Sequence, residues 1–284
     1  MTDDLTTQRA ARDATRIDAD HARSWQLVSA MTRDLFDQAE LGRADQIIID
    51  LEDAVDESNK AAARADVVDW LSTGGTAWVR INDVTVPDWE RDVEALAGVP
   101  GLRGVVLAKV EAPEQVTDTY ARLGGSTPVV PLLESALGIE LATPIAQATG
   151  SFRLAFGSGD YRKDTGTEAV AMAMAYPRSR LVIASRVGGL PGPIDGPTPL
   201  ATHSLLREHI GDAVALGLTG KLCLDLEQPA IINESMAPSR SDIEWAQEFL
   251  ADFDARGRIV RDGSDKPRLG RAERIQQRAR IFGL

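Results

Sequence analysis

Short runs of apolar and β-branched residues recur along the chain, and they give the first expectation about its structure. Most of these runs are continuous rather than alternating between apolar and polar residues. Continuous runs are typical of strands that are buried on both faces, as in a parallel sheet covered by helices. Eight segments fit this pattern: Trp25–Ser29, Gln46–Leu51, Thr76–Ile81, Gly104–Lys109, Pro128–Leu133, Phe152–Gly157, Leu181–Ser185 and Lys221–Asp225.

The segments between these strands carry apolar residues at helical spacing. Strands that alternate with helices predict an α/β fold of the (β/α)₈ type, a TIM barrel. A doubly wound open sheet is the alternative, but no glycine fingerprint of a dinucleotide site follows the first strand. The expected helices are Met31–Leu41, Ser58–Leu71, Trp89–Ala97, Pro113–Leu123, Ser135–Gln147, Thr167–Tyr176 and His203–Leu216.

The C-terminal part of the chain has a different pattern. We expect the barrel to occupy residues 1–239, with residues 1–22 as an N-terminal extension. Ser241 and Glu244 form a capping-box pattern that opens a helix to about Arg256. A turn rich in Gly and Asp and a last, arginine-rich helix follow. Residues 240–284 are therefore expected to form a helical segment that packs on the barrel or on a neighbouring subunit.

Composition excludes several classes of protein. The 284 residues are 43% hydrophobic, which is enough for a sizeable core. The net charge of −12 disfavours nucleic-acid binding, because a phosphate backbone would repel it. The single cysteine, Cys223, cannot build a disulfide or a cysteine zinc site within the chain. No apolar run is long enough to span a membrane, and residues 1–24 lack the core of a secretion signal, so a cytoplasmic location is the default expectation.

Charged residues gather where the predicted strands end, and this is the end of a TIM barrel that carries chemistry. The second strand ends in Asp50-Leu51-Glu52-Asp53, and the third contains Arg80. Glu134 and Asp160 follow the fifth and sixth strands. Two carboxylates, with waters and substrate oxygens, are a ligand set that suits Mg²⁺. A planar arginine fork suits a substrate carboxylate.

Each of these residues also has a purely structural interpretation. Glu134 could favour a helix N-terminus, and Asp160 could cap a loop. Arg80 could form a structural salt bridge with the carboxylates of residues 50–53. Lys109, at the end of the fourth strand, is more readily explained as a lysine at the edge of the core than as a catalyst.

Several motifs together resemble the citrate lyase β-subunit-like family of the HpcH/HpaI aldolase group, which includes malyl-CoA and β-hydroxyacyl-CoA lyases. The resemblance covers roughly residues 23–281, including Arg23-Ser24 and GLTGK (Gly217–Lys221). The motifs that carry it are IIIDLEDAV (Ile47–Val55), WVRIN (Trp78–Asn82), VLAKVE (Val106–Glu111), LLESALGI (Leu132–Ile139), FGSGDY (Phe156–Tyr161) and DGSDKPRLGRAERI (Asp262–Ile275).

The resemblance implies a trimeric or hexameric TIM-barrel enzyme that uses Mg²⁺. By position, Glu134 and Asp160 match the metal ligands, and Arg80 matches the arginine that binds substrate. Glu52 and Asp53 match the surrounding polar shell, and Arg23 matches an arginine on the coenzyme A side. The chain departs from the family at Val28-Ser29-Ala30 and Leu224-Asp225-Leu226, where Val-Pro-Gly and Ile-His-Pro are common. These loops border the thioester side, so the acyl carrier stays open.

The implied reaction is cleavage of a carbon–carbon bond in a carboxylated 3-hydroxyacyl thioester, such as a malyl-, citramalyl- or citryl-CoA-like substrate. The products would be a 2-oxo acid and an acyl-CoA enolate. Arg80 and Glu134 would contact the substrate, and Arg80 would share the developing charge. Glu52 is the candidate base within the barrel. Asp265, in the C-terminal segment, is the alternative if it reaches a neighbouring subunit's site.

Two other functions are consistent with the sequence. A class I aldolase would form a Schiff base on a lysine at a strand end, and Lys109 has that position. A non-catalytic protein, or a subunit active only within a larger lyase complex, would explain the altered loops. The segment Val187–Pro199, rich in Pro and Gly, is interpreted as either a lid over the substrate mouth or a rigid surface turn.

Overall fold

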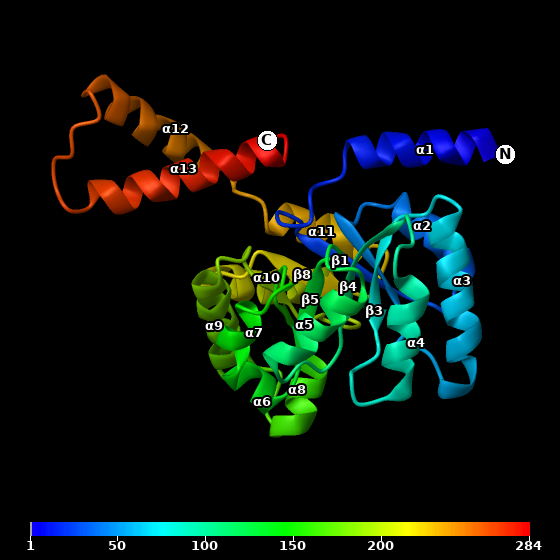
Figure 1. Ribbon diagram of the computed structural model, residues 1–284. Helices are drawn as coiled ribbons and strands as arrows, with labels where there is room; N and C mark the ends of the chain where they lie inside the picture. Colours follow the sequence, from blue (N-terminus) through cyan, green and yellow to red (C-terminus); the bar gives the residue numbers. More distant parts are fainter. Residues whose placement is uncertain (1) are drawn as a thin grey trace. The chain divides into compact units, whose positions relative to one another are not determined.

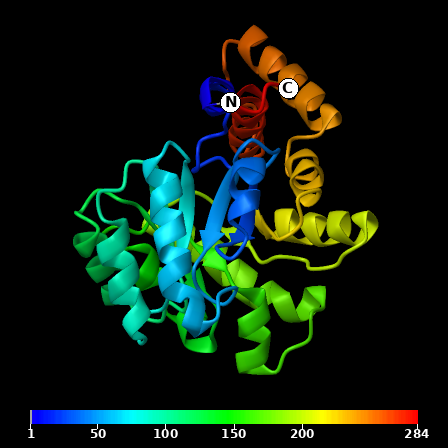
Figure 2. The ribbon, with the colours of Figure 1, turned by 90° about the vertical axis from the view of Figure 1, so that its right-hand side faces the viewer.

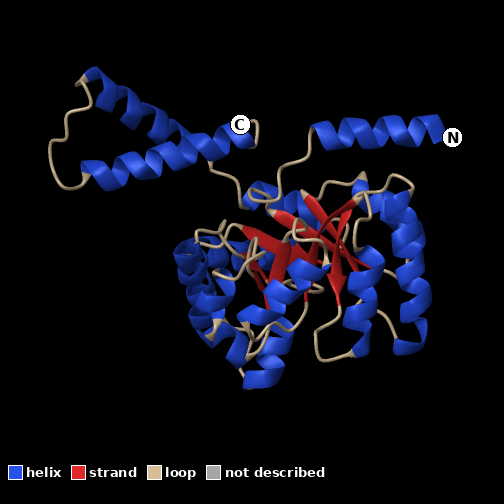
Figure 3. Cartoon of the chain, in the orientation of Figure 1, coloured by secondary structure: helices blue, strands red, loops and turns tan. Residues whose placement is uncertain are grey.

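The computed structural model describes residues 2–284, with side chains from Asp4 onward. Eight parallel strands close into a barrel in sequence order, so the predicted TIM-barrel fold is confirmed. Helices surround the strands in both views of the ribbon (Figures 1 and 2) and in the cartoon of helices and strands (Figure 3). The strands are β1 (Ser24–Ser29), β2 (Gln46–Asp50), β3 (Ala77–Ile81), β4 (Leu102–Leu107), β5 (Val129–Leu133), β6 (Ala155–Phe156), β7 (Ile194–Asp195) and β8 (Gly220–Cys223).

Thirteen α-helices and two short 3₁₀ helices accompany these strands in residues 2–284. The 3₁₀ helices are η1 (Arg33–Leu35) and η2 (Glu57–Asn59). The α-helices are α1 (Thr2–Ala14), α2 (Phe36–Glu40), α3 (Lys60–Ser72), α4 (Pro87–Leu96), α5 (Pro113–Arg122), α6 (Ala136–Glu140), α7 (Ala142–Ala146), α8 (Ser158–Thr165), α9 (Ala171–Gly188), α10 (His203–Leu216), α11 (Gln228–Ser235), α12 (Arg240–Ala255) and α13 (Asp265–Ile281).

The apolar runs are continuous because both faces of each strand are buried. In β2, Ile48 belongs to the cluster that fills the barrel, together with Trp78 and Val106. Its neighbours Ile47 and Ile49 belong to the second cluster, between the sheet and the helices. Side chains alternate between the two faces of a strand, so each face needs its own apolar layer.

One predicted strand is wrong. Leu181–Ser185 lies within α9, where Leu181 and Ala184 are buried and Ile183 is 55% exposed. This burial follows the period of a helix, and a short apolar run does not distinguish the two structures by itself. The seventh strand is instead Ile194–Asp195, inside the segment interpreted as a lid or a surface turn.

The true seventh strand is short, and its polar residue explains why it was missed. Asp195 is fully buried, and its two carboxylate oxygens accept hydrogen bonds from Arg178 Nε at 2.8 Å and Lys221 Nζ at 2.9 Å. Both cations are themselves buried. A charged side chain can be buried in a core when it is paired, but a short segment that contains one has the sequence pattern of a loop.

The C-terminal segment forms a compact unit of its own, Glu234–Leu284, and the remaining chain up to Asn233 forms the other. Within it, α12 begins after Ser239, whose hydroxyl accepts the Asp242 N–H at 3.1 Å, two residues before the expected cap. Arginines pack over aromatic rings, as Arg271 does over Trp245 at 4.8 Å. How this segment packs on a barrel or a neighbouring subunit stays a prediction.

A membrane span requires a long and strongly apolar helix. Over the described part of the chain, residues 2–284, no helix combines the necessary length with sufficient apolar character.

Candidate active site

The C-terminal ends of five consecutive strands bring acidic and basic side chains together. Asp50 ends β2 and lies in register with Arg80 of β3. Lys109 follows β4, Glu134 directly follows β5, and Asp160 lies in the first turn of α8, after β6. The expected gathering of polar residues at this end of the barrel is therefore present in the fold. The order of the strands in the barrel thus brings together residues that are more than 100 positions apart in the sequence.

Arg80 is held by the carboxylates that precede it in the sequence. Its Nε and Nη2 donate to the two oxygens of Asp50 at 2.7 and 2.6 Å, and its Nη1 lies 3.1 Å from Glu52 Oε2. Burial alone would lower the pKa of Arg80, but the bonds and charge of Asp50 outweigh it and raise the pKa. Asp50 thus occupies one edge of the guanidinium, and this contact is the structural salt bridge that the sequence allowed as one interpretation of Arg80. Only the Nη1 side faces groups that a substrate could displace.

Lys109 closes the other side of Glu52. Its Nζ contacts Glu52 Oε1 and lies 3.5 Å from Asp53 Oδ1. These carboxylates raise the pKa of Lys109 despite its partial burial. A Schiff-base lysine needs the opposite shift, because the neutral amine is the nucleophile. The environment of Lys109 therefore opposes the class I aldolase chemistry.

Glu52 is buried between these two cations, yet it is not fully satisfied. Its side chain is 4% exposed, and Oε2 has no hydrogen-bond partner. Burial raises the pKa of Glu52, and the charges of Arg80 and Lys109 oppose this only in part. A buried carboxylate with a raised pKa and an oxygen that makes no hydrogen bond has the properties of a general base.

Glu134 is positioned by the backbone on both sides. Its Oε1 accepts the backbone N–H of Lys109 at 2.8 Å. Lys109 adopts a left-handed φ of 51°, which is uncommon for a residue with a side chain and is often found at functional sites. On the other side, a Cβ at Gly157 would lie 2.3 Å from Glu134 Oε2, so only glycine fits there. The orientation of this carboxylate is therefore determined by the chain around it.

Negative charge exceeds positive charge around Glu134. Burial raises the pKa of Glu134 to about 8, and the nearby charges of Glu52 and Asp160 raise it further than Arg80 can lower it. Five carboxylates, Asp50, Glu52, Asp53, Glu134 and Asp160, share this end of the barrel with the cations of Arg80 and Lys109. The excess of negative charge is what a bound cation would neutralise.

Within residues 2–284, no group of three or more His, Cys, Asp or Glu side chains is arranged to hold an ion. Glu134 is buried, and Asp160 is half-buried and close enough to affect its pKa. A pair of carboxylates fits Mg²⁺, which commonly keeps several waters or substrate oxygens among its ligands.

Sequence reasoning missed the residues that support the loop after β2. Lys60, at the start of α3, donates to the carbonyl oxygens of Leu51 and Glu52 at 2.9 and 3.0 Å, and to Asn82 Oδ1 at 2.7 Å. Asn82 in turn donates to Asp92 at 2.6 Å. The signal in the sequence was a lysine eight residues after Glu52, at the start of a predicted helix. Its partners at residues 51 and 52 are backbone carbonyls, which leave no pattern in the residue types.

Two predicted site residues lie elsewhere. Arg23 precedes β1, at the N-terminal end of the barrel, where Asp45 accepts hydrogen bonds from its Nε at 2.9 Å and its Nη2 at 3.1 Å. Asp265 belongs to the C-terminal unit, where the bond from Arg256 at 2.7 Å holds its pKa at about 2. The roles of Arg23 in substrate binding and of Asp265 as a base stay predictions.

Comparisons with known proteins match nearly the whole chain. The family model described as HpcH/HpaI aldolase/citrate lyase matches residues 23–225, and that of the HpcH/HpaI aldolase C-terminal domain matches residues 241–283. A citrate lyase subunit beta-like protein of Mycobacterium tuberculosis is 30% identical over 83% of this chain and 88% of its own.

Two further matches agree with these. The L-malyl-CoA/beta-methylmalyl-CoA lyase of Cereibacter sphaeroides is 27% identical over 78% of this chain and 80% of its own. The crystal structure of CitE from Mycobacterium tuberculosis in complex with magnesium, acetoacetate and coenzyme A is similar with a TM-score of 0.77 and 28% identity. That similarity covers 92% of this chain and 99% of the CitE chain.

Proposed function

This chain belongs to the HpcH/HpaI aldolase/citrate lyase family, and from that premise we propose that it cleaves a carbon–carbon bond in a carboxylated 3-hydroxyacyl-CoA thioester, with Mg²⁺ as cofactor. The family match confirms the resemblance carried by the motifs, and relatives named as lyases agree with the predicted class of enzyme. Substrates of the malyl-, citramalyl- or citryl-CoA type fit the proposal. The products would be a 2-oxo acid and an acyl-CoA.

One observation carries the metal assignment. Glu134 is a buried carboxylate whose pKa is raised to about 8 by burial and by neighbouring carboxylates. The ionised form of such a carboxyl is unfavourable unless a cation neutralises its charge. Glu134 and Asp160 would hold the ion, which supplies Lewis-acid stabilisation of the oxygen that becomes negative during cleavage.

The chain's own residues account for the remaining requirements. Arg80, with Asp50 fixing one edge of its guanidinium, directs Nη1 at the substrate carboxylate. Glu52 accepts the proton of the substrate hydroxyl, because its pKa is raised and its Oε2, which is ion-paired with Arg80 Nη1, makes no hydrogen bond. The hydroxyl oxygen becomes the carbonyl of the 2-oxo acid. The electron pair of the broken bond passes to the thioester as an enolate, which then takes up a proton.

Positioning of Glu52 depends on Lys109 and Lys60. Lys109 contacts Glu52 Oε1, and Lys60 binds the backbone carbonyl of Glu52 at 3.0 Å. A base held at both ends loses less orientational freedom when substrate binds. A trimer or hexamer, in which Asp265 of another copy completes the site, is the further expectation from the resemblance.

The proposal is tested by turnover of the purified full chain. CoA thioesters of the malyl, citramalyl and citryl types are each supplied with Mg²⁺, and release of the 2-oxo acid is followed as its phenylhydrazone. We expect turnover of at least one thioester, loss of it with EDTA, and recovery with added Mg²⁺. Turnover that thorough chelation leaves unchanged would remove the metal from the proposal.

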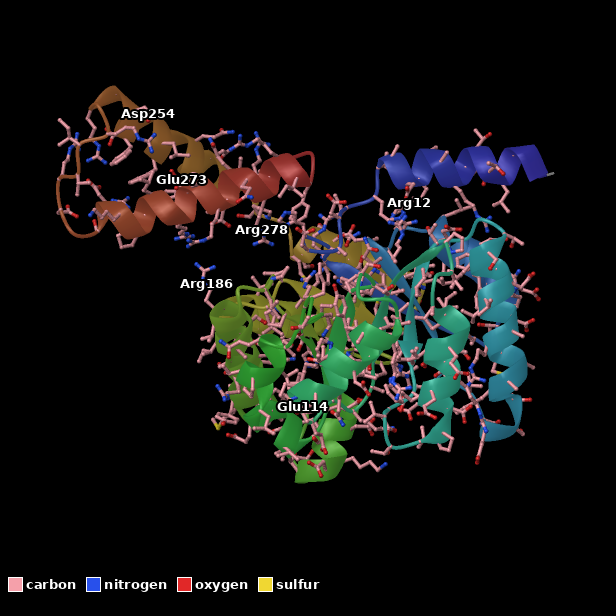
Figure 4. All side chains as sticks on the ribbon, viewed as in Figure 1. Arg12, Glu114, Arg186, Asp254, Glu273 and Arg278 are labelled. Carbon is pink, nitrogen blue, oxygen red and sulfur yellow. The ribbon has the colours of Figure 1, made fainter. Side chains whose placement is uncertain are left out.

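A pair of variants with the same chemical change locates the activity. Glu134→Gln removes the proposed ligand, whereas Glu114→Gln removes an exposed carboxylate at the start of α5, on the outside of the barrel (Figure 4). We expect Glu134→Gln to abolish turnover and Glu114→Gln to leave it unchanged. Full activity in Glu134→Gln would show that this carboxylate holds no essential ion.

A further inference from the structure

A second cavity lies at the opposite end of the barrel from the candidate active site. Its volume is about 480 Å³, which is in the range of small-molecule sites. Gln46 begins β2, Arg103 lies near the start of β4, and Phe152 precedes β6, so the cavity is at the N-terminal ends of the strands. The segment after α1, including Arg16, forms its other wall.

Helix α1 is attached to this end of the barrel by its arginines. Arg12 points from α1 toward the barrel (Figure 4) and donates to the carbonyl oxygens of Gly42 at 3.1 Å and Ala44 at 2.5 Å, just before β2. Arg103 contacts Asp13 near the end of α1. The N-terminal extension thus supplies part of the lining of the cavity.

Two arginines in the cavity have unused hydrogen-bond donors. The Arg16 side chain is 4% exposed, yet its Nε and Nη1 have no hydrogen-bond partner, and the nearest carboxylate oxygen to Nε is Asp13 Oδ1 at 3.5 Å. Its Nη2 donates to the Glu40 carbonyl at 3.2 Å. Arg103 Nε is also buried without a partner. Buried guanidinium donors are usually paired, so these three N–H groups indicate a missing acceptor.

The local charge agrees with this. Burial lowers the pKa of Arg16 to about 10, and the charges of Arg12 and Arg103 lower it further than Glu40 and Asp13 can raise it. The guanidinium groups therefore repel one another, and Asp13 Oδ1, which contacts Arg103 Nη2 and lies 3.5 Å from Arg16 Nε, offsets only part of this repulsion. An anion bound between Arg16 and Arg103 would relieve that repulsion and accept their free N–H groups.

The remaining wall is apolar and flat. Trp78 and Phe152 are stacked with ring centroids 5.4 Å apart. Trp78 Nε1 already donates to Gln46 Oε1 at 3.1 Å, and Gln46 Nε2 donates to the Ile17 carbonyl at 2.7 Å. These polar atoms need no ligand, so this wall offers only ring surface, which favours a flat apolar group.

The rim limits the charge that a ligand can carry. Asp18 and Asp20 line the opening and are exposed. They would repel a multiply charged anion such as a phosphate more strongly than a single carboxylate. The cavity therefore combines a cationic pair, a flat apolar wall and an acidic rim.

We propose that this cavity binds a flat organic monocarboxylate, aromatic or otherwise unsaturated, with its carboxylate between Arg16 and Arg103 and its apolar body along Phe152. The site is separate from the lyase site, because the two lie at opposite ends of the same strands. It gives the protein a second small-molecule site, independent of the proposed lyase activity.

Calorimetry with benzoate as the probe tests the proposal on the full chain. We expect saturable binding of one benzoate per chain, weakened at least tenfold in Arg16→Met and in Arg103→Met. Arg240→Met makes the same change in charge at a residue that is 93% exposed, and Glu134→Gln alters only the candidate active site. Both controls should bind as the parent protein does. Absence of binding to the parent protein, or unchanged binding in the Arg16 and Arg103 variants, overturns the proposal.

Two further measurements keep the test decisive if Arg16→Met folds poorly. Crystals of the parent protein soaked with 4-bromobenzoate should show the anomalous bromine signal in the cavity beside Phe152. A bromine found only at the other end of the barrel overturns the assignment. Inorganic phosphate is titrated in parallel, and binding as tight as that of benzoate refutes the monocarboxylate class.

Discussion

Protonation of Glu134 should govern how tightly the protein binds Mg²⁺. Without a cation, burial and neighbouring carboxylates raise the pKa of Glu134 to about 8 from 4.5. A metal ion binds the ionised carboxylate, so the proton must leave first. Below about pH 8 the apparent affinity should fall tenfold for each pH unit, which is about 100-fold between pH 9 and pH 6. Calorimetric titrations with Mg²⁺ at several pH values, in buffers of different ionisation enthalpy, measure both the affinity and the released proton.

The same pKa predicts the pH dependence of stability in the metal-free protein. A carboxyl whose folded-state pKa is raised stabilises the fold fully below its unfolded pKa, near 4.5, and this contribution is lost as the pH rises through about 8. A pKa that moves from 4.5 to about 8 corresponds to about 5 kcal/mol in total. Denaturant unfolding with EDTA should therefore show a free energy of unfolding that decreases over this range, and saturating Mg²⁺ should restore it at high pH.

Glu134→Gln is the matched control for both measurements. The amide cannot ionise, so the variant should lose the pH-dependent component between pH 4.5 and 8, and Mg²⁺ should no longer stabilise it. If parent and Glu134→Gln have the same pH profile, or if Mg²⁺ affinity is constant from pH 6 to 9, the assignment of a raised pKa to Glu134 is refuted.

Three other substitutions or treatments test the remaining parts of the site. Gly157→Ala places a Cβ 2.3 Å from Oε2 of Glu134, the proposed metal ligand, so we expect a cost of about 1–3 kcal/mol in the free energy of unfolding and loss of Mg²⁺ binding. Gly159→Ala, whose Cβ would have nothing within 4 Å, should change stability by no more than about 1 kcal/mol, and equal effects of the two substitutions would contradict the steric argument. Asp50→Asn breaks the buried ion pair with Arg80 and should lower the free energy of unfolding in denaturant by about 3–5 kcal/mol. It should also raise KM more than it lowers kcat, because the Arg80 guanidinium is no longer held in place. An unchanged KM would exclude Arg80 as the group that binds the substrate carboxylate. Borohydride with a 2-oxo acid should leave the mass of the protein unchanged, because the raised pKa of Lys109 keeps its amine charged; a reduced adduct on this lysine would restore the Schiff-base mechanism.

Most of the barrel could be predicted because its strands are buried on both faces. The runs Gln46–Leu51 and Gly104–Lys109 are continuous in apolar residues. In the structure β2 lies within the first run, and β4, which is Leu102–Leu107, overlaps the second. The seventh strand could not be found in this way. Its two residues include the buried Asp195, whereas the more apolar Leu181–Ser185 lies in a helix and contributes Leu181 and Ala184 to its buried face. Hydrophobicity identifies burial, and only tertiary pairing determines which buried segment becomes the strand.

The site was predictable in position but not in its internal pairing. The fold alone implies that residues ending β2 to β6 meet, since parallel strands end at one edge of the barrel. The sequence does not determine which carboxylate Arg80 binds, and Asp50 was one of several possibilities. Nor does it show that the Lys109 backbone, rather than its side chain, holds Glu134. Such contacts depend on register and on backbone angles, which leave no pattern in the residue types.

The framework around the site holds its unbalanced charge in place. Carboxylates that repel one another would normally turn outward to water, but here they are fixed at the ends of three strands: Asp50, Glu52 and Asp53 at β2, Glu134 at β5 and Asp160 at β6. Arg64 continues the support outward, because its Nε donates at 2.6 Å to Asp92, the same carboxylate that binds Asn82. The chain Arg64–Asp92–Asn82–Lys60 therefore connects two helices to the loop that carries Glu52. A repulsive cluster on a framework of this kind is already organised for a cation, so ion binding requires little rearrangement of the protein.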